Sequence, residues 1–330
     1  MTLYLHIGIM KTGTTFIQDN LYYNRDEMAK FGYIYPNFMK NKGNLHDHNP
    51  LVHKLYTCFW HKDEKWIEDE CVHQFKEKGY KNVVISAENF SWQFTSKQSI
   101  AFLKEKFMSM GFTKIYILIY LRDASFFITS IYSQLVKRNS IVGYNNVYID
   151  TKEKIIEKSL DSKKIIKNYI DVFGKENLIV RLFDKNEFYQ GDLFKDFVHA
   201  IGLQWSDNFT ISKKKTNESL DLIGIELQRR FNKKGLGGYE AQNKKTLLNF
   251  IEKHFTSNYD PYLKFQPPKE IIQSYIDYFK ESNEWVRKEF FPHKESLFPK
   301  KDLTDYKENY ELKEMKPEYW DKITEFVVDI

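Results

Sequence analysis

The stretch 3-LYLHIGIMKTGTTFIQ-18 decides the fold, because it joins an apolar strand to a helix through a short glycine loop. Apolar residues alternate over its first five positions, as in a strand, and a helical period begins at Phe16. Gly8 and Gly13 frame a turn that can direct backbone N–H groups toward one point, and the following helix directs its N-terminal donors to the same point. The stretch predicts a strand, a loop that binds an anion, and a helix.

The position of the lysine separates this loop from the usual triphosphate loop. The Gly8-x4-Gly13 spacing is the same, but the triphosphate motif places lysine directly after the second glycine, where this chain has Thr14. Lys11 lies inside the loop, so we expect it to approach a bridging or leaving oxygen of the ligand. A plain strand-to-helix turn with a solvated lysine remains an alternative.

Composition argues against a nucleic-acid partner. The chain has 330 residues and a formal charge of +5, and its lysines and acids are interspersed without a basic tail. Aromatic residues make up 17% of the chain, which suits either stacking on sugar rings or an ordinary core. The small net charge is compatible with positive charge that is confined to an anion site.

The cysteines and the apolar runs predict a cytoplasmic protein. Cys58 and Cys71 lie in a polar region, which fits a reducing compartment better than a disulfide scaffold. The first strand leaves no room for a signal segment before it, and the longest apolar run, Ile115 to Leu121, is too short to cross a bilayer. We therefore expect no stable membrane insertion.

Strands alternate with helices over the first two thirds of the chain. Short apolar strands are expected at 82–86, 115–121 and 177–183, and Tyr33 to Pro36 is expected to turn away from the first helix. Helices are expected at 14–30, 62–78, 97–110, 125–137, 151–173, 191–201, 217–232, 244–255 and 268–290. This order predicts an α/β fold with a central parallel sheet flanked by helices.

We expect one domain spanning residues 1–330. Its α/β core would cover 1–212, with an irregular insertion at 37–75, and 213–330 would form a mainly helical cap packed on the core. No linker rich in glycine, serine or proline separates the two parts.

Three polar side chains follow the carboxyl ends of separate strands. Lys11, Glu88 and Arg122 each occupy such a place, and ligands of parallel sheets bind outside these ends. Arg122 also has a hydroxyl partner at Ser130, on the next predicted helix. A guanidinium can fork two phosphate oxygens while a serine hydroxyl binds a third, although Arg122 and Asp123 would also form an ordinary surface ion pair.

Together these motifs resemble the sulfotransferases that use 3'-phosphoadenosine 5'-phosphosulfate (PAPS), in particular the bacterial, glycan-modifying type. KTGTT at 11–15, ISAEN at 85–89, RDASFFITS at 122–130 and RLFD at 181–184 carry the resemblance over about residues 2–230. It implies a three-layer P-loop-like fold. It also implies a 5'-phosphosulfate loop formed by Lys11, Thr12, Gly13, Thr14 and Thr15, and a 3'-phosphate site at Arg122 and Ser130.

The family's late basic glycine loop has an imperfect counterpart. Relatives carry Arg-Lys-Gly there, whereas this chain has Lys233, Lys234 and Gly235, with lysine where arginine is expected. The resemblance implies that Lys234 and Gly235 close over the 3'-phosphate. A flexible connection between two helices explains the same residues equally well.

Sulfuryl transfer needs positioning, charge stabilisation and a base. Lys11 would stabilise the leaving phosphate without a metal. Glu88 stands where glycan-type relatives carry a glutamate and is our choice of general base. A carboxylate that caps the next helix or pairs with Lys11 is the alternative. His46 and His48, in the stretch expected to form an irregular lid, are the other candidate bases. As metal ligands they lack partners at suitable spacing.

The sequence thus favours a metal-independent sulfotransferase that moves a sulfuryl group from PAPS to a hydroxyl of a carbohydrate or glycan. A nucleotide-dependent kinase of a sugar or small molecule, and a catalytically silent nucleotide-binding protein, are the alternatives. Acceptor specificity would lie in residues 37–75, in the 139–150 loop and in the helical cap. The acceptor and the oligomeric state are left open.

Overall fold

The computed structural model describes residues 1–36, 46–61, 80–137, 160–212, 219–233, 241–256 and 261–329. The chain divides into two compact units. The first comprises Met1–Arg122, Lys154–Lys214 and Glu281–Leu297. The second comprises Asp123–Glu153, Lys215–Lys280 and Phe298–Ile330. The predicted packing of a C-terminal cap on the core stays a prediction.

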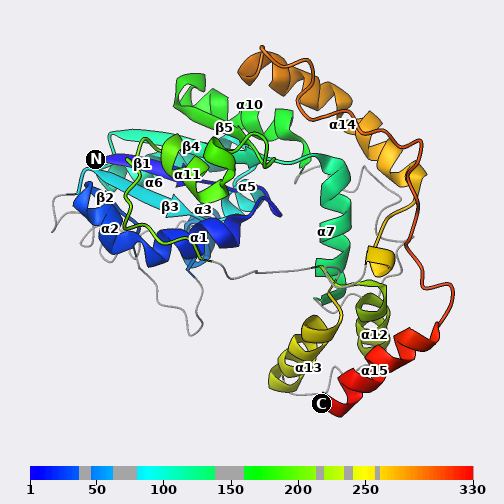
Figure 1. The fold of residues 1–330 in the computed structure, drawn as a ribbon. Coiled ribbons are helices and arrows are strands. Elements are labelled where there is room, and N and C mark those ends of the chain that lie inside the picture. The colour runs from blue at the N-terminus through cyan, green and yellow to red at the C-terminus, as the bar shows by residue number, and fades with distance from the viewer. Residues whose placement is uncertain are drawn as a thin grey trace. The chain divides into compact units, whose positions relative to one another are not determined.

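A parallel five-stranded sheet forms the centre of the first unit, with strand order β2-β3-β1-β4-β5 (Figure 1). Its strands are β1 (Thr2–His6), β2 (Tyr33–Ile34), β3 (Asn82–Ser86), β4 (Lys114–Leu121) and β5 (Leu178–Leu182). The predicted α/β fold with a parallel sheet flanked by helices is confirmed. The prediction that Tyr33 to Pro36 turns away was wrong, because Tyr33 and Ile34 pair with β3 at the sheet edge.

The central strands fix where the polar residues emerge. Leu5 of β1 lies between Ile85 of β3 and Ile117 of β4, and all three side chains are buried, as expected for strands covered on both faces. Residue 6 of β1 pairs with Leu118, while β4 runs on to Leu121. Arg122 therefore begins just beyond the end of β1, at the edge where the Gly8–Gly13 loop starts.

One face of the sheet packs against α1 (Thr14–Tyr23), α2 (Arg25–Lys30) and α11 (Leu193–Ala200). Ile17 of α1 and Phe197 of α11 belong to the same buried cluster as Tyr120 of β4. The predicted continuous helix from 14 to 30 was wrong at one point, because Asn24 separates α1 from α2. The Asn24 amide donates to the carbonyls of Asn20 and Thr210, at 2.8 Å each, in place of continuing the helix.

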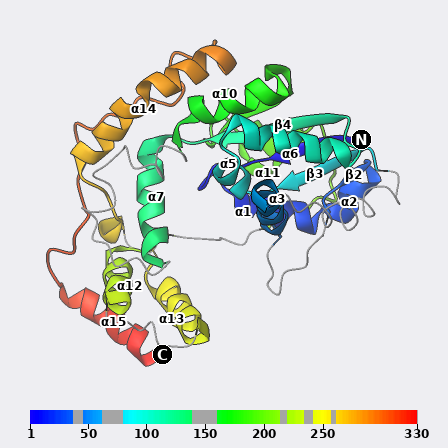
Figure 2. The same ribbon diagram turned by 180° about the vertical axis from the view of Figure 1, so that it is seen from behind.

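The other face carries α5 (Asn89–Gln93), α6 (Lys97–Ser109) and α10 (Ser162–Phe173), and Figure 2 looks onto it. Ser96 and Ser99 form a capping box at the start of α6, and Asp161 caps α10. The Tyr169 hydroxyl of α10 donates to the Phe90 carbonyl of α5 at 3.3 Å. Two short 3₁₀ turns, η1 (Lys175–Asn177) and η2 (Tyr189–Gly191), flank β5.

Part of the expected irregular insertion is a regular helix, α3 (Asn49–His61). Pro50 stands in its first turn, where a missing N–H costs nothing. Leu51, Leu55 and Cys58 recur at helical spacing and are buried. The prediction of an irregular insertion was therefore wrong for 49–61, while 37–45 and 62–79 lie outside the described residues.

The second unit is helical in the part that the structure describes. Its elements are α7 (Ala124–Lys137), α12 (Leu222–Lys233), α13 (Ala241–His254), η4 (Pro261–Leu263), the first part of α14 (Lys269–Phe290) and α15 (Pro317–Asp329). The predicted helices at 217–232, 244–255 and 268–290 are confirmed with shifted ends, and α15 was not expected. No helix within the described ranges has both the length and the apolar character needed to cross a bilayer.

Candidate active site

The Gly8–Gly13 loop has an unusual backbone. Gly8 and Gly13 have φ of +52° and +72°, and Lys11 between them has φ of +68°. Residues other than glycine rarely adopt this left-handed backbone conformation, because it costs them roughly 1–2 kcal/mol. Such strain persists where the surrounding structure holds it and is concentrated at functional sites. Lys11 is therefore fixed in a conformation that the loop imposes on it.

Both glycines are also required by close packing. A Cβ at Gly13 would lie 2.5 Å from Leu193 Cδ2 and 3.0 Å from Phe183 Cε2. A Cβ at Gly8 would lie 2.9 Å from Thr14 Cγ2 and 3.1 Å from the Cα of Glu88. The loop is thus pressed between Leu193 of α11 and Glu88, which lies two residues beyond β3.

The start of α1 offers backbone donors rather than a side-chain cap. Gly13 is the N-cap residue, and within the described chain no side chain caps this helix. The Thr12 hydroxyl donates to the Ile9 carbonyl at 2.6 Å, so Thr12 would contribute only its N–H to a ligand. Thr15 is exposed on the first turn. An anion at this point would meet N–H groups and the positive end of the helix dipole.

The structure brings Glu88 to this loop. The Thr14 hydroxyl donates to Glu88 Oε2 at 3.0 Å. This bond links the first residue of α1 to the residue just before α5. Thr14 is buried and Glu88 is partly exposed. Glu88 is the N-cap residue of α5, but its side chain does not cap that helix. As placed, the Thr14 hydroxyl proton is directed to the carboxylate rather than to a phosphate.

Arg122 also meets the loop. Its Nη1 donates to the Lys11 carbonyl at 2.5 Å, and its guanidinium carbon lies 5.3 Å from the centre of the Phe183 ring. The Phe183 N–H donates to the Leu121 carbonyl, which extends the β4–β5 pairing to this point. A guanidinium has five N–H groups, so it can donate to more than one acceptor.

The predicted roles of Ser130, Lys234 and Gly235 in phosphate binding stay predictions. Ser130 belongs to α7 in the second unit, and its hydroxyl donates to the Phe127 carbonyl at 3.0 Å. Its pairing with Arg122 on one phosphate stays a prediction. Lys234 and Gly235 fall outside the described residues, and Lys233 is the exposed last residue of α12.

The two candidate histidines have other partners. His48 is buried, its Nδ1 accepts from the Ser86 N–H at 3.0 Å, and its Nε2 bonds the Pro36 carbonyl at 2.7 Å. Burial lowers the pKa of His48 to about 4. His46 Nδ1 lies 2.6 Å from Asp19 Oδ1, and its ring stacks on Tyr22. With both ring nitrogens engaged, His48 holds β3 to the chain before α3, and this geometry does not support it as a base.

A polar cluster beside Glu88 was missed by sequence reasoning. Asn89, the last residue of the ISAEN stretch, donates its N–H to Asn49 Oδ1 at 3.3 Å, a contact that the motif does not predict. The amides of Asn89 and Gln93 lie 3.3 Å and 3.0 Å from the two ring nitrogens of His53. A neutral imidazole has one N–H, so one of these amides must present its oxygen. Only the folding of α3 against α5 brings these residues together.

No three His, Cys, Asp or Glu side chains among the described residues are grouped as a metal site requires. The described residues place a strained lysine loop, a carboxylate and an arginine at one sheet edge.

Comparisons with known proteins find distant similarity. No family model matches the chain. An uncharacterised protein from Archaeoglobus fulgidus is 25% identical over 186 residues, which is 56% of this chain and about half, 48%, of that protein. The crystal structure of a sulfotransferase from Alicyclobacillus acidocaldarius is similar with a TM-score of 0.39 and 14% identity, and the match covers 73% of this chain and 98% of that one.

Proposed function

We propose that the chain is a sulfotransferase that moves a sulfuryl group from PAPS to a hydroxyl of a carbohydrate or glycan. The observation that carries the proposal is the meeting of three side chains at one edge of the sheet. Thr14 of the Lys11 loop bonds Glu88, and Arg122 bonds the Lys11 carbonyl.

In the proposed reaction, the acceptor oxygen attacks sulfur as the bond between sulfur and the 5'-phosphate oxygen breaks. The acceptor proton passes to the Glu88 carboxylate, and the phosphate leaves as 3'-phosphoadenosine 5'-phosphate. Lys11 and the N–H groups at the start of α1 stabilise the charge on the leaving oxygen. The bond that Glu88 accepts from Thr14 orients the carboxylate toward the loop.

Lys11, Thr12, Gly13, Thr14 and Thr15 would hold the 5'-phosphate, and Arg122 and Ser130 the 3'-phosphate. The loop suits a close backbone approach, because both glycines that frame it have positive φ. Lys234 and Gly235 are proposed to close over the 3'-phosphate. The reaction as proposed uses no metal.

The carbohydrate acceptor is supported by the chemistry next to Glu88. Asn49, His53, Asn89 and Gln93 offer amide and imidazole groups that exchange hydrogen bonds with hydroxyls as either donor or acceptor. This polar cluster continues from the proposed base along α3 and α5.

The test has two parts. Isothermal titration should detect binding of 3'-phosphoadenosine 5'-phosphate without added metal, and mass spectrometry should detect a sulfuryl group added to a member of a glycan panel when PAPS is present. Binding of ATP with Mg²⁺ at least as tight as that of 3'-phosphoadenosine 5'-phosphate would favour a kinase. Nucleotide binding with no product from any acceptor would favour a silent binding protein.

A further inference from the structure

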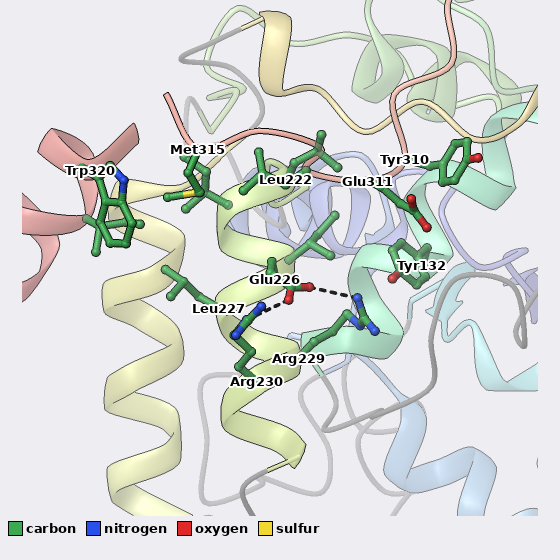
Figure 3. A pocket seen from close by; sticks show the side chains of 14 residues that line it. Tyr132, Leu222, Glu226, Leu227, Arg229, Arg230, Tyr310, Glu311, Met315 and Trp320 are labelled. Atoms are coloured by element: carbon green, nitrogen blue, oxygen red, sulfur yellow. Dashed lines mark hydrogen bonds and ion pairs between the residues drawn. The ribbon is translucent and has the colours of Figure 1, made fainter. Parts of the chain in front are cut away.

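A separate pocket lies within the second unit, over one face of α12. It has a volume of about 570 Å³, within the range of small-molecule sites. Its walls come from α12, from the 310–315 segment, from α15 and from Tyr132 of α7 (Figure 3). All of these elements belong to the same unit.

The walls of this pocket are mainly apolar. Leu222 and Leu227 of α12 face it, and Met315 and Trp320 stand at its side in Figure 3. Trp320 is 57% exposed and Met315 is 36% exposed. Large apolar side chains left in contact with water at a concave site favour binding of an apolar body, because burial of their surface is favourable.

One polar group on α12 interrupts the apolar surface. Both oxygens of Glu226 are used, since Oε2 accepts from Arg229 Nη1 at 2.9 Å and Oε1 from Arg230 Nε at 2.8 Å. One carboxylate thus serves two guanidinium groups, and this trio has a net positive charge. Glu311 also lines the pocket but is exposed to solvent.

One N–H donor of Arg229 has no partner within the described part of the chain. Its Nε is buried and has no hydrogen-bond partner among the described residues, whereas the Nε of Arg230 is paired with Glu226. A buried donor without a partner is unfavourable, and a hydrogen bond to a charged partner removes that cost. An anionic oxygen suits this position, because a hydrogen bond from a guanidinium to a charged acceptor is stronger than one to a neutral acceptor.

We propose that this pocket binds a single-chain anionic amphiphile, with its apolar chain along Leu222, Met315 and Trp320 and its carboxylate or phosphate at Arg229. The site is separate from the Lys11 loop. Its occupation does not depend on the proposed sulfuryl transfer.

Titration of the full chain with three twelve-carbon probes tests the proposal. Dodecanoate, dodecyl phosphate and dodecanol share one apolar chain and differ at the head, and each is used below the concentration at which it aggregates. One or both anionic probes should bind about tenfold or more tighter than dodecanol. The anionic probe that binds more tightly shows whether the pocket prefers a carboxylate or a phosphate head group.

Neighbouring arginines provide a matched control. Arg229→Gln should weaken binding of the better anionic probe by about tenfold, while Arg230→Gln, which also loses a bond to Glu226, should leave it within about twofold. Trp320→Ala removes an exposed side chain and should weaken all three probes. The proposal is overturned if no probe binds, if dodecanol binds as tightly as the anions, or if both arginine variants have the same effect.

Discussion

The Thr14 hydroxyl donates a hydrogen bond to Glu88 Oε2 at 3.0 Å, although the two residues are 74 positions apart. The bond joins the first turn of α1 to the second residue beyond β3. Since β1 and β3 are parallel neighbours, their carboxyl ends lie side by side, and the two side chains emerge at the same edge. The proposed anion loop and the proposed base are therefore parts of one site.

Glu88→Gln should abolish most turnover and preserve nucleotide binding. The glutamine oxygen can still accept the Thr14 hydrogen bond, but an amide cannot take a proton from the acceptor. We expect kcat to fall by ~10²–10⁴, the usual contribution of a general base. Rates are measured with the acceptor found in the glycan panel, and binding of 3'-phosphoadenosine 5'-phosphate by titration.

Thr14→Val is the control for that prediction. Valine keeps the branched shape of the buried side chain and replaces the hydroxyl with a methyl group, so kcat should fall less than in Glu88→Gln. If Glu88→Gln retains nearly full turnover, Glu88 has a structural role and the base lies elsewhere.

Gly13→Ala should destabilise the fold more than Gly32→Ala. Both glycines have positive φ, +72° and +78°, so both substitutions carry the cost of the left-handed backbone, roughly 1–2 kcal/mol. Only Gly13 is crowded, since an added Cβ would lie 2.5 Å from Leu193 Cδ2, whereas nothing lies within 4 Å of the position at Gly32. Overpacking should add about 1–3 kcal/mol at Gly13.

Urea unfolding of the two variants measures this difference. Gly32→Ala should also leave nucleotide affinity unchanged, whereas Gly13→Ala should weaken it by moving the loop. Equal destabilisation of the two variants would mean that α11 does not press on the loop.

The sequence predicted the sheet and the convergence of the loop, Glu88 and Arg122, because both follow from local patterns. An apolar strand before a glycine loop is visible in one stretch, and parallel order follows from strands that alternate with helices. Strand β2 was missed because two residues, Tyr33 and Ile34, are too few to show a period. Its existence depends on β3, which supplies the partner.

Helix α3 and the roles of the histidines were harder to predict for another reason. Pro50 and the spacing of Leu51, Leu55 and Cys58 were visible signals of a helix, but the polar residues around them masked the pattern. The partners of His48, the Ser86 N–H and the Pro36 carbonyl, are backbone groups of other segments. No property of a histidine in sequence tells which backbone groups it will meet.

Stability should fall between pH 6.5 and pH 4 in part because of His48. Burial lowers the pKa of His48 from 6.5 to about 4, so the unfolded chain binds a proton in this window that the folded chain does not. The contribution of neutral His48 is fully present above pH 6.5, is lost as the pH falls to 4, and amounts to about 3 kcal/mol.

Urea unfolding of the wild type and of His48→Gln at several pH values between 7.5 and 4 tests this prediction. The variant is less stable at pH 7.5, because it loses the geometry of two hydrogen bonds, but its stability should decline less steeply on acidification. Parallel declines would show that His48 is not held neutral in the fold. His6 is also buried, and its pKa is lowered to about 3, so the variant should keep part of the decline.

Lys11→Gly and Lys11→Ala should separate the chemical role of Lys11 from its backbone strain. Both remove the amine that is proposed to stabilise the leaving phosphate, so both should lose nearly all turnover. They differ in the folded backbone, because φ of +68° is strained for alanine and unstrained for glycine. Glycine also has more conformational freedom than alanine in the unfolded chain, and this offsets part of the stability that the unstrained backbone provides. We therefore expect Lys11→Gly to be more stable than Lys11→Ala by up to about 1 kcal/mol, measured by urea unfolding, while the two remain equally inactive. Turnover by either variant near the wild-type rate would remove Lys11 from the mechanism, whatever the stability result.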